Sequence, residues 1–580
     1  MTLDVGSRGA GTIYLIAIQV VSRGLTFIGN QTLLRYVSPS HLGLAVQLEA
    51  LSISVLYTAR ESIRVALQRT SGAATGKESS QAAVNAGYLV VLLGLSLGTL
   101  LSSFYLYPSG SNVVETPGFK HAFWLYAGAT ILELLSEPCF VVVQQHSLFR
   151  DRARAETTAA IARCLASCAA AVYMSNHDMA MSVLPFGVGQ LGYGLSLFTV
   201  YTWSATRVAA YEHFSLLPSQ LPTGRQTWLS LFSKPLMKVA GAFYLQSIFK
   251  WALTQGDTVI MSYFADLQSQ GIFALASNYG GLASRLLFQP VEESSRNVFG
   301  ALLPAQRTST KSPDIVQKRQ QALDYLSTTL HGYTLLIAIP CSTLLPQIFP
   351  ILVSALLGSK SQWNSTQTSA LLSAYSYYIP FLAINGILDA FVTSVATQAE
   401  LGIQSIMMVS VTAIYLSAAA FFMDSMGMGA VGLVYANIIN MFLRIVFSLW
   451  FIRGWTQENI PETAAKARPS AFAQFCKKCL PSSACLFTSA VVALGLQAQG
   501  YVKLGLADSA TVAGLSKLRI GQLNLDLFDL SYLFSAVVVL ISTILLTERN
   551  FLLGTVEPLL PRRFRSALEP YLQSREKKEQ

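Results

Sequence analysis

The feature that most constrains this chain is a series of apolar segments, each about 20 residues long or longer, that recurs along its length. A helix needs roughly 20 apolar residues to cross the hydrocarbon core of a bilayer. Composition agrees, because 52% of the 580 residues are apolar and only 12% are charged, whereas a soluble domain carries roughly 25% charged residues. We therefore predict an all-α integral membrane protein with about fourteen transmembrane helices. The segments lie near 11–35, 42–69, 82–106, 121–145, 155–175, 180–203, 237–263, 271–300, 323–354, 368–397, 401–422, 427–451, 470–497 and 527–547.

The basic residues predict the orientation of these helices. An even number of spans places both termini on one side, together with most loop lysines and arginines and the basic tail. By the positive-inside rule this side is cytosolic. The net charge of +10 then reflects membrane orientation, and we expect no nucleic-acid partner. The N-terminus lacks a charged leader with a cleavage site, so we expect the first helix to be retained as a signal-anchor. The opposite side would hold only Lys120, Lys360, Lys503, Lys517 and Arg519.

Short motifs give little sign of catalysis or of a cofactor. Cys476 and Cys479 have a CxxC spacing, but no second pair or nearby histidine completes a zinc site, and we interpret them as juxtamembrane cysteines. The absence of a GxxxxGK[ST] sequence argues against ATP hydrolysis by this chain. Asn364 begins an Asn-Ser-Thr sequon on the predicted non-cytosolic side and is a candidate glycosylation site. We predict neither a metal nor a cofactor.

One internal repeat indicates how the spans are organised. Glu61-Ser-Ile-Arg64 near the end of the second span resembles Glu293-Ser-Ser-Arg296 near the end of the eighth. Six spans separate the two, so both would have the same orientation. We therefore predict two six-helix lobes related by a pseudo-twofold axis along the membrane normal, followed by two C-terminal helices. The predicted regions are 1–235 for the N-lobe, 236–455 for the C-lobe, and 456–580 for spans thirteen and fourteen with a basic cytosolic tail.

Charged residues inside the predicted spans are the candidate site. An arginine at the centre of a membrane helix costs about 2.5–3.5 kcal/mol on insertion scales, so such residues face a partner or a water-filled cavity. Arg23, Arg60 and Arg64 stand on the first two spans, where Glu61 is the only nearby acid, although acids such as Glu133 on other spans could offset part of the excess. A second group balances its charges; it contains Lys250, Asp257, Arg285, Glu292, Glu293 and Arg296.

These charges allow two interpretations. A cavity with surplus arginine suits an anionic substrate, because guanidinium groups bind phosphate oxygens bidentately. Alternatively, the charges pair with one another and lock the helices together. Arg163 and Asp389 also lie inside spans, but the sequence does not assign either of them to a helix face.

Three segments of this chain resemble a known family. They are Thr26-Phe-Ile-Gly-Asn-Gln-Thr-Leu-Leu-Arg-Tyr-Val-Ser-Pro39, Leu56-Tyr-Thr-Ala-Arg-Glu-Ser-Ile-Arg64 and Tyr378-Ile-Pro-Phe-Leu-Ala-Ile-Asn-Gly-Ile-Leu-Asp-Ala-Phe391. They look like the Rft-type oligosaccharide-translocation proteins of the multidrug/oligosaccharidyl-lipid/polysaccharide exporter superfamily. Asp389 departs from that pattern, which has Glu there. The resemblance covers the first two-thirds of the chain and fades after about residue 455.

The resemblance implies a function, a location and roles for the charged residues. It implies a fourteen-span protein of the endoplasmic reticulum membrane that moves Man5GlcNAc2-PP-dolichol from the cytosolic to the lumenal leaflet for N-linked glycosylation. Arg23, Arg60 and Arg64 would hold the pyrophosphate, and Lys250, Arg285 and Arg296 would face them across a cleft. Asn30, Gln246 and Asp257 are candidates for contacts with sugar hydroxyls.

Other functions remain open at this point. The chain could be a non-transporting accessory or chaperone factor that works with other proteins of the N-glycosylation pathway. It could also be an ion-coupled exporter of the same superfamily, with Asp257 and Asp389 as ion-binding carboxylates. A membrane-embedded glycosyltransferase is disfavoured, because the sequence has no DxD motif for a metal and its loops are short and basic.

Overall fold

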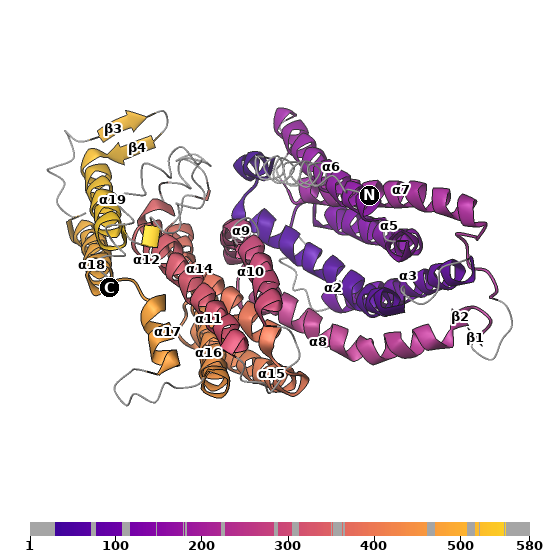
Figure 1. Ribbon diagram of the computed structural model, residues 1–580. Coiled ribbons are helices and arrows are strands. Elements are labelled where there is room, and N and C mark those ends of the chain that lie inside the picture. Colours follow the sequence, from indigo (N-terminus) through magenta and orange to yellow (C-terminus); the bar gives the residue numbers. More distant parts are fainter. Residues whose placement is uncertain are drawn as a thin grey trace, which may run out of the picture. The chain divides into compact units, whose positions relative to one another are not determined.

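The chain is built from long α-helices (Figure 1). The computed structural model describes residues 29–70, 77–106, 116–146, 148–177, 179, 182–221, 227–283, 288–303, 313–349, 351, 362–363, 366–460, 470–506, 517–520, 523–549 and 551–552. It divides into two compact units, Met1–Leu275 with Lys360–Trp363, and Ala276–Ser359 with Asn364–Gln580. The strands in the described part form two antiparallel hairpins.

In the first unit α7 packs along both α5 and α6, while α2 packs against α3, α5 and α8. The indole of Trp251 on α8 donates a 3.1 Å hydrogen bond to Ser54 on α2, which links these two helices. The elements are α2 (Pro39–Thr70), α3 (Lys77–Leu106), α5 (Phe119–Gln145), α6 (Phe149–Asn176), α7 (Leu184–Glu212), β1 (Thr227–Trp228), β2 (Phe232–Ser233), α8 (Lys234–Phe264) and the first half of α9 (Leu267–Ala283).

In the second unit α14 packs against α10 and α16, and the aromatic rings of Phe299, Phe391 and Trp455 meet edge to face in its core. Its elements after α9 are α10 (Gln289–Leu302), α11 (Pro313–Tyr333), η2 (Thr334–Ala338), α12 (Ile339–Thr343), α14 (Thr366–Val395), α15 (Gln398–Ala420), η3 (Phe421–Ser425), α16 (Gly429–Asn459), α17 (Ala471–Cys479), α18 (Ser483–Leu506), β3 (Lys517–Ile520), β4 (Leu523–Asp526) and α19 (Leu527–Thr547).

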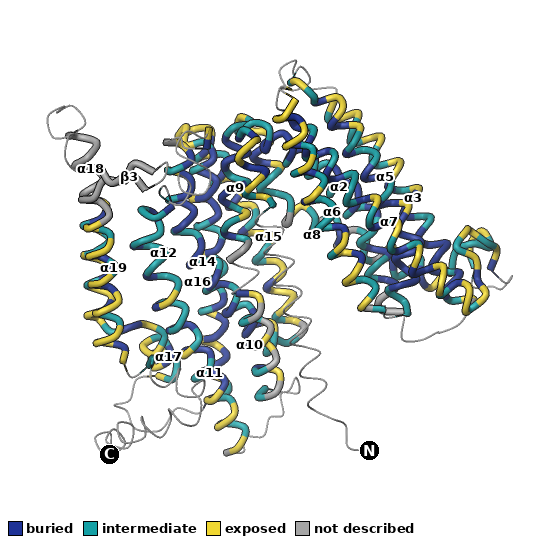
Figure 2. Tube along the Cα trace, turned by 90° about the horizontal axis from the view of Figure 1, so that it is seen from above, coloured by how far each residue is buried: buried dark blue, intermediate teal, exposed yellow. Residues whose placement is uncertain are grey.

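The lengths and apolar character of these helices fit a chain that crosses the membrane many times. Within the described residues seven helices are long and apolar enough to span a bilayer, or up to eight if the bent pair α17–α18 is one span. Figure 2 shows exposed residues along many of the helices. Large apolar side chains are among them, such as Trp124, which is 72% exposed, as expected of surfaces that contact lipid. The all-α membrane fold is therefore confirmed. The count of fourteen spans, the lobe symmetry and a lobe boundary at 235/236 stay predictions, and α8 belongs to the first unit.

A close approach between α2 and α9 depends on two glycines. A Cβ atom built on Gly43 would overlap the backbone carbonyl of Leu267, and one built on Gly271 would overlap the carbonyl of Pro39. Because these neighbours are backbone atoms, they cannot move aside like a flexible side chain. Small residues at such crossings let membrane helices pack backbone to backbone.

We expect Gly43→Ala or Gly271→Ala to lower the free energy of unfolding by about 1–3 kcal/mol, the usual cost of overpacking. The measurement is the denaturant-driven unfolding of the purified chain in micelles. Gly402→Ala on α15 is the matched control, because a Cβ there meets no atom within 4 Å. Equal stability of all three variants would contradict the argument from close packing.

Candidate functional site

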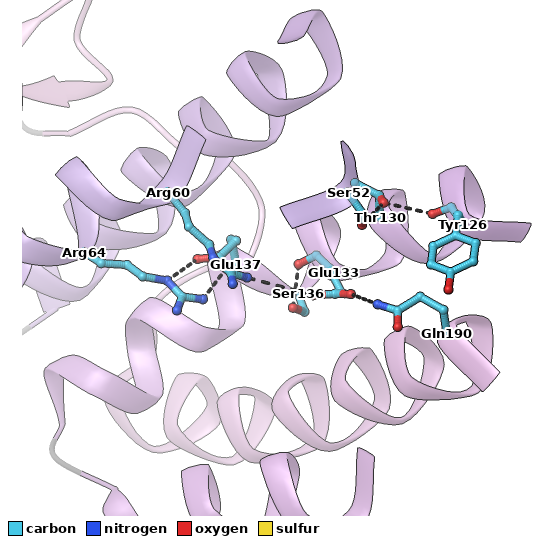
Figure 3. A network of polar contacts seen from close by, with 9 residues as sticks. All are labelled: Ser52, Arg60, Arg64, Tyr126, Thr130, Glu133, Ser136, Glu137 and Gln190. Carbon is cyan, nitrogen blue, oxygen red and sulfur yellow. Dashed lines mark hydrogen bonds and ion pairs between the residues drawn. The ribbon is translucent and has the colours of Figure 1, made fainter. Parts of the chain in front are cut away.

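The first unit contains a partly buried network of polar side chains on α2, α5 and α7 (Figure 3), and an ion pair between α2 and α6 belongs to the same unit. Arg60 and Arg64 lie one helical turn apart on α2, so both guanidinium groups project from one face. They point toward Glu133 and Glu137, which are likewise one turn apart on α5. Here "the polar network" means these four residues with Gln190 and the Glu49–Arg163 pair.

Glu137 is the centre of the polar network. Its carboxylate is 1% exposed and accepts two hydrogen bonds from Arg64, one from Nε at 3.1 Å and one from Nη2. The guanidinium of Arg64 also lies 3.7 Å from the centroid of the Phe140 ring, a cation–π contact. Arg64 is therefore held by a bidentate ion pair and by an aromatic face.

Arg60 is held less firmly than Arg64. Its Nη1 atom lies 3.5 Å from Glu137 and 3.9 Å from Glu133, distances at the long end of ion pairing. The side chain of Arg60 is 27% exposed. Glu133 is 5% exposed at its side chain and accepts a 3.0 Å hydrogen bond from Nε2 of Gln190 on α7. Arg60 thus bridges two carboxylates without a short hydrogen bond to either.

Arg163 on α6 forms the other ion pair of the polar network. Its Nη1 and Nη2 atoms donate to the two oxygens of Glu49 on α2, at 2.9 and 2.7 Å. These residues are 114 positions apart in the chain. Both could be recognised in the sequence as charges within apolar segments, but their spacing gave no sign that they meet.

The described ion pairs show how part of the expected arginine surplus is compensated, while Arg23, the third arginine of that group, lies outside the described residues. In the described part of the polar network three arginines face three carboxylates, because Glu49, Glu133 and Glu137 approach the arginines from facing helices. The sequence offered acids on other spans as counter-charges, but only the packing of α2 on α5 shows that Glu133 and Glu137 lie next to Arg60 and Arg64. Arg64 pairs with Glu137 of α5. Glu61, which lies on α2 like Arg64, is half-buried.

We expect removal of one partner of the Glu49–Arg163 pair to destabilise the first unit more than removal of both. The side chains of Arg163 and Glu49 are 35% and 31% exposed, so an uncompensated charge here should cost more than the about 0.2–1 kcal/mol of a surface pair and less than the about 3–5 kcal/mol of a buried one. An apolar replacement of the whole pair is often close to neutral. The free energies of unfolding of Glu49→Leu, Arg163→Leu and the double variant would measure this coupling. Additive losses in the double variant would show that the pair contributes no interaction energy.

The second unit brings one further set of predicted residues together. Arg296 on α10 lies 3.9 Å from Asp389 on α14, and Asp389 also accepts a 2.9 Å hydrogen bond from Gln404 on α15. The side chain of Arg296 is 50% exposed. Glu292 packs so close to Gly386 that a Cβ atom on this glycine would overlap its carboxylate. These contacts favour the interpretation that Asp389 holds neighbouring helices together.

No described contact links the remaining candidate residues to the polar network. Asp257 is half-buried on α8 and Asn30 is exposed on a helix that precedes α2. Their proposed contacts with sugars therefore stay predictions. The backbones of Gln246, Lys250 and Glu293 lie in α8 and α10, but their side chains fall outside the description, and so do the whole residues Arg23, Arg285 and Asn364.

Comparisons with known proteins identify the family. The family model described as Rft protein matches residues 7–556. The relative "Man(5)GlcNAc(2)-PP-dolichol translocation protein RFT1" of Yarrowia lipolytica is 32% identical, over 77% of this chain and 70% of its own length. The relative of the same name from Candida glabrata is 30% identical, over 88% and 94%.

A solved structure supports the fold independently. The lipid II flippase MurJ in an inward closed conformation superposes with a TM-score of 0.56, covering 93% of this chain and 100% of MurJ at 11% identity. At that identity the likeness concerns the fold alone. Together with the apolar helices described above, it supports the fold of a multi-pass membrane protein. The resemblance seen around Arg60 and Arg64 is confirmed, and the chain belongs to the Rft protein family.

Proposed function

We propose that this protein moves Man5GlcNAc2-PP-dolichol from the cytosolic to the lumenal leaflet of the endoplasmic reticulum membrane, for protein N-glycosylation. The names of its relatives support this cargo, since they are called translocation proteins for it. None of those names denotes an enzyme, and we propose transport without a catalysed reaction. Both termini would lie in the cytosol.

The proposal rests on one observation, that Arg60 is held only by long contacts in the polar network. A pyrophosphate is a strong anion whose oxygens bind guanidinium groups bidentately. Arg60 is partly exposed and its contacts with Glu133 and Glu137 are long. It can therefore turn from carboxylate to phosphate at small cost, whereas Arg64 would have to give up two hydrogen bonds and a ring contact.

Charge balance sets a condition on this exchange. Since the described network already pairs three arginines with three carboxylates, a bound pyrophosphate would add uncompensated negative charge. Binding then has to loosen the contacts of Arg60 with its carboxylates or recruit another cation, for which Arg23 is the predicted candidate. Such rearrangement would link cargo binding to helix packing, since the same carboxylates join α2 to α5.

The rest of the cargo fits a transporter without ATP hydrolysis. The dolichol tail can stay in the lipid while the polar headgroup crosses inside the protein, which reduces the desolvation cost of sugars and phosphates. Rocking of the two predicted lobes would expose the site to each leaflet in turn, driven by the cargo gradient or by a counter-ion.

The test is translocation by the purified full-length chain in liposomes that contain Man5GlcNAc2-PP-dolichol. An impermeant mannose-binding lectin reports the cargo in the outer leaflet with time. We expect the protein to accelerate crossing at least tenfold over empty liposomes. Equal rates with and without folded protein, the folding verified by a monodisperse elution profile, would reject direct transport and favour the accessory role in the same pathway.

A further inference from the structure

A second site lies in the other unit, at the end of the α15–α16 helix pair. The two helices are antiparallel and are joined through η3 and a turn in which Gly427 and Gly429 have positive φ. At the opposite end, where α15 begins and α16 ends, a pocket of about 460 Å³ opens between them. The basic residue Arg453 at this end belongs to the side predicted to be cytosolic.

The shape of the pocket follows from one helix face of α16. Residues 447, 450, 454 and 458 recur at intervals of three and four, so they form one stripe. Gly454 leaves the stripe hollow, since an added Cβ atom would meet nothing within 4 Å. Phe451 and Trp455, 8% and 5% exposed, anchor the floor in the core of the second unit. The hollow is therefore built on packed residues.

Chemically the pocket has an apolar part and a charged part. Ile403, Phe447 and Trp450 line the deeper part; the Phe447 and Trp450 rings lie 5.8 Å apart, and Trp450 is 63% exposed. Arg453 and Glu458 line the outer part with Glu400 and Gln457. From Phe447 to Glu458 the helix advances 11 residue steps, a rise of about 16.5 Å at 1.5 Å per residue. That length equals roughly half of a ~30 Å hydrocarbon core, or one leaflet.

The charges select a ligand with one anionic and one cationic group. Arg453 forms no ion pair or hydrogen bond through its guanidinium with any described residue, so it can bind a phosphate. Two carboxylates and the amide oxygen of Gln457 provide acceptors for a primary ammonium, which has three donors. The exposed face of Trp450 adds a cation–π surface. A lipid whose headgroup is only anionic would face two carboxylates and one guanidinium in this pocket, so it should bind less well.

From these features we propose that the α15–α16 pocket binds a phosphatidylethanolamine molecule of the cytosolic leaflet. Its phosphate would pair with Arg453, its ammonium with Glu458 and the Trp450 face, and its upper acyl chains would lie on Ile403 and Phe447. The site is separate from the polar network of the first unit, and it does not depend on the proposed cargo.

The first test uses tryptophan quenching by lipids brominated in the acyl chain, added to the purified full-length protein in detergent. We expect brominated phosphatidylethanolamine to quench more fluorescence than phosphatidylglycerol, and Trp450→Phe to abolish the difference. Trp203→Phe is the matched control, because Trp203 is also an exposed indole but its ring is already covered by Arg207, 3.6 Å away. Equal quenching by the two lipids, or a difference that survives Trp450→Phe, would overturn the proposal.

The second test examines the headgroup contacts by measuring retained lipid with native mass spectrometry. We expect Arg453→Gln and Glu458→Gln each to reduce retention of phosphatidylethanolamine about tenfold, as loss of about 1.4 kcal/mol requires. The variant is made at Glu458 because replacing Glu400 would also break the capping box of α15, in which Glu400 accepts hydrogen bonds from Thr397. Retention of phosphatidylcholine equal to that of phosphatidylethanolamine would reject the ammonium contact and overturn the assignment. Unchanged retention in both variants would do so too.

Discussion

Replacing Arg60 with alanine is expected to reduce translocation of the proposed cargo by about 10- to 150-fold, while the protein stays folded and abundant. Hydrogen bonds to charged groups contribute about 1.5–3 kcal/mol, and 1.4 kcal/mol corresponds to a factor of ten. Folding should be little affected, because the contacts of Arg60 with Glu133 and Glu137 are 3.9 and 3.5 Å long and its side chain is 27% exposed. The liposome assay with the mannose-binding lectin measures the rate.

Arg64→Ala is the matched variant for this prediction, because Arg64 lies one turn away on the same helix face. It should lower the yield of folded protein, since Arg64 has two hydrogen bonds to Glu137 and packs on Phe140. Arg60→Lys should keep part of the rate, because lysine retains the charge but not the bidentate geometry. Full translocation by Arg60→Ala would show that Arg60 does not hold the pyrophosphate. Loss of folded protein in Arg60→Ala as well would favour the interpretation that these charges only lock helices together.

The fold class could be predicted because apolar segments of membrane length are a property of the sequence itself. The predicted segment 121–145 corresponds to α5 (Phe119–Gln145), and 82–106 lies within α3 (Lys77–Leu106). The family could also be predicted, because the short runs around Arg60 and Asp389 are specific in residue type and order. Helix ends are harder to predict, because some helices begin in polar sequence. For example, α11 begins at Pro313, whereas the apolar segment begins near residue 323.

The pairing of the candidate residues could not be predicted in the same way. Arg64 and Glu137 are 73 positions apart, and Glu49 and Arg163 are 114 apart. Periodicity assigns residues to one face of their own helix, but it does not tell which helix packs against that face. The sequence places Glu61 three positions before Arg64, whereas the acid that pairs with Arg64 is Glu137 on α5. Only the packing of α2 on α5 revealed that Glu137 holds Arg64.

Glu137→Ala is expected to produce the largest loss of stability in the polar network. Glu137 is 1% exposed and pairs with both Arg60 and Arg64, so its removal leaves two arginines short of a counter-charge in a poorly hydrated interior. Breaking a buried pair from one side costs about 3–5 kcal/mol. The free energy of unfolding in mixed micelles, measured with increasing denaturing detergent, should fall by that amount.

The control for Glu137 is another glutamate that pairs with an arginine but is exposed. Glu156 lies 2.9 Å from Arg152 on α6, with side chains 53% and 41% exposed, and an exposed pair contributes about 0.2–1 kcal/mol. Glu156→Ala should therefore be nearly neutral. The double variant Arg64→Leu/Glu137→Leu should regain part of the loss of Glu137→Ala, because it removes one of the unpaired charges. Equal losses of stability in Glu137→Ala and Glu156→Ala would mean that the interior around Glu137 is well hydrated. The polar network would then be a water-filled cavity. A phosphate could displace its carboxylates from the arginines as easily as it displaces carboxylates on the protein surface.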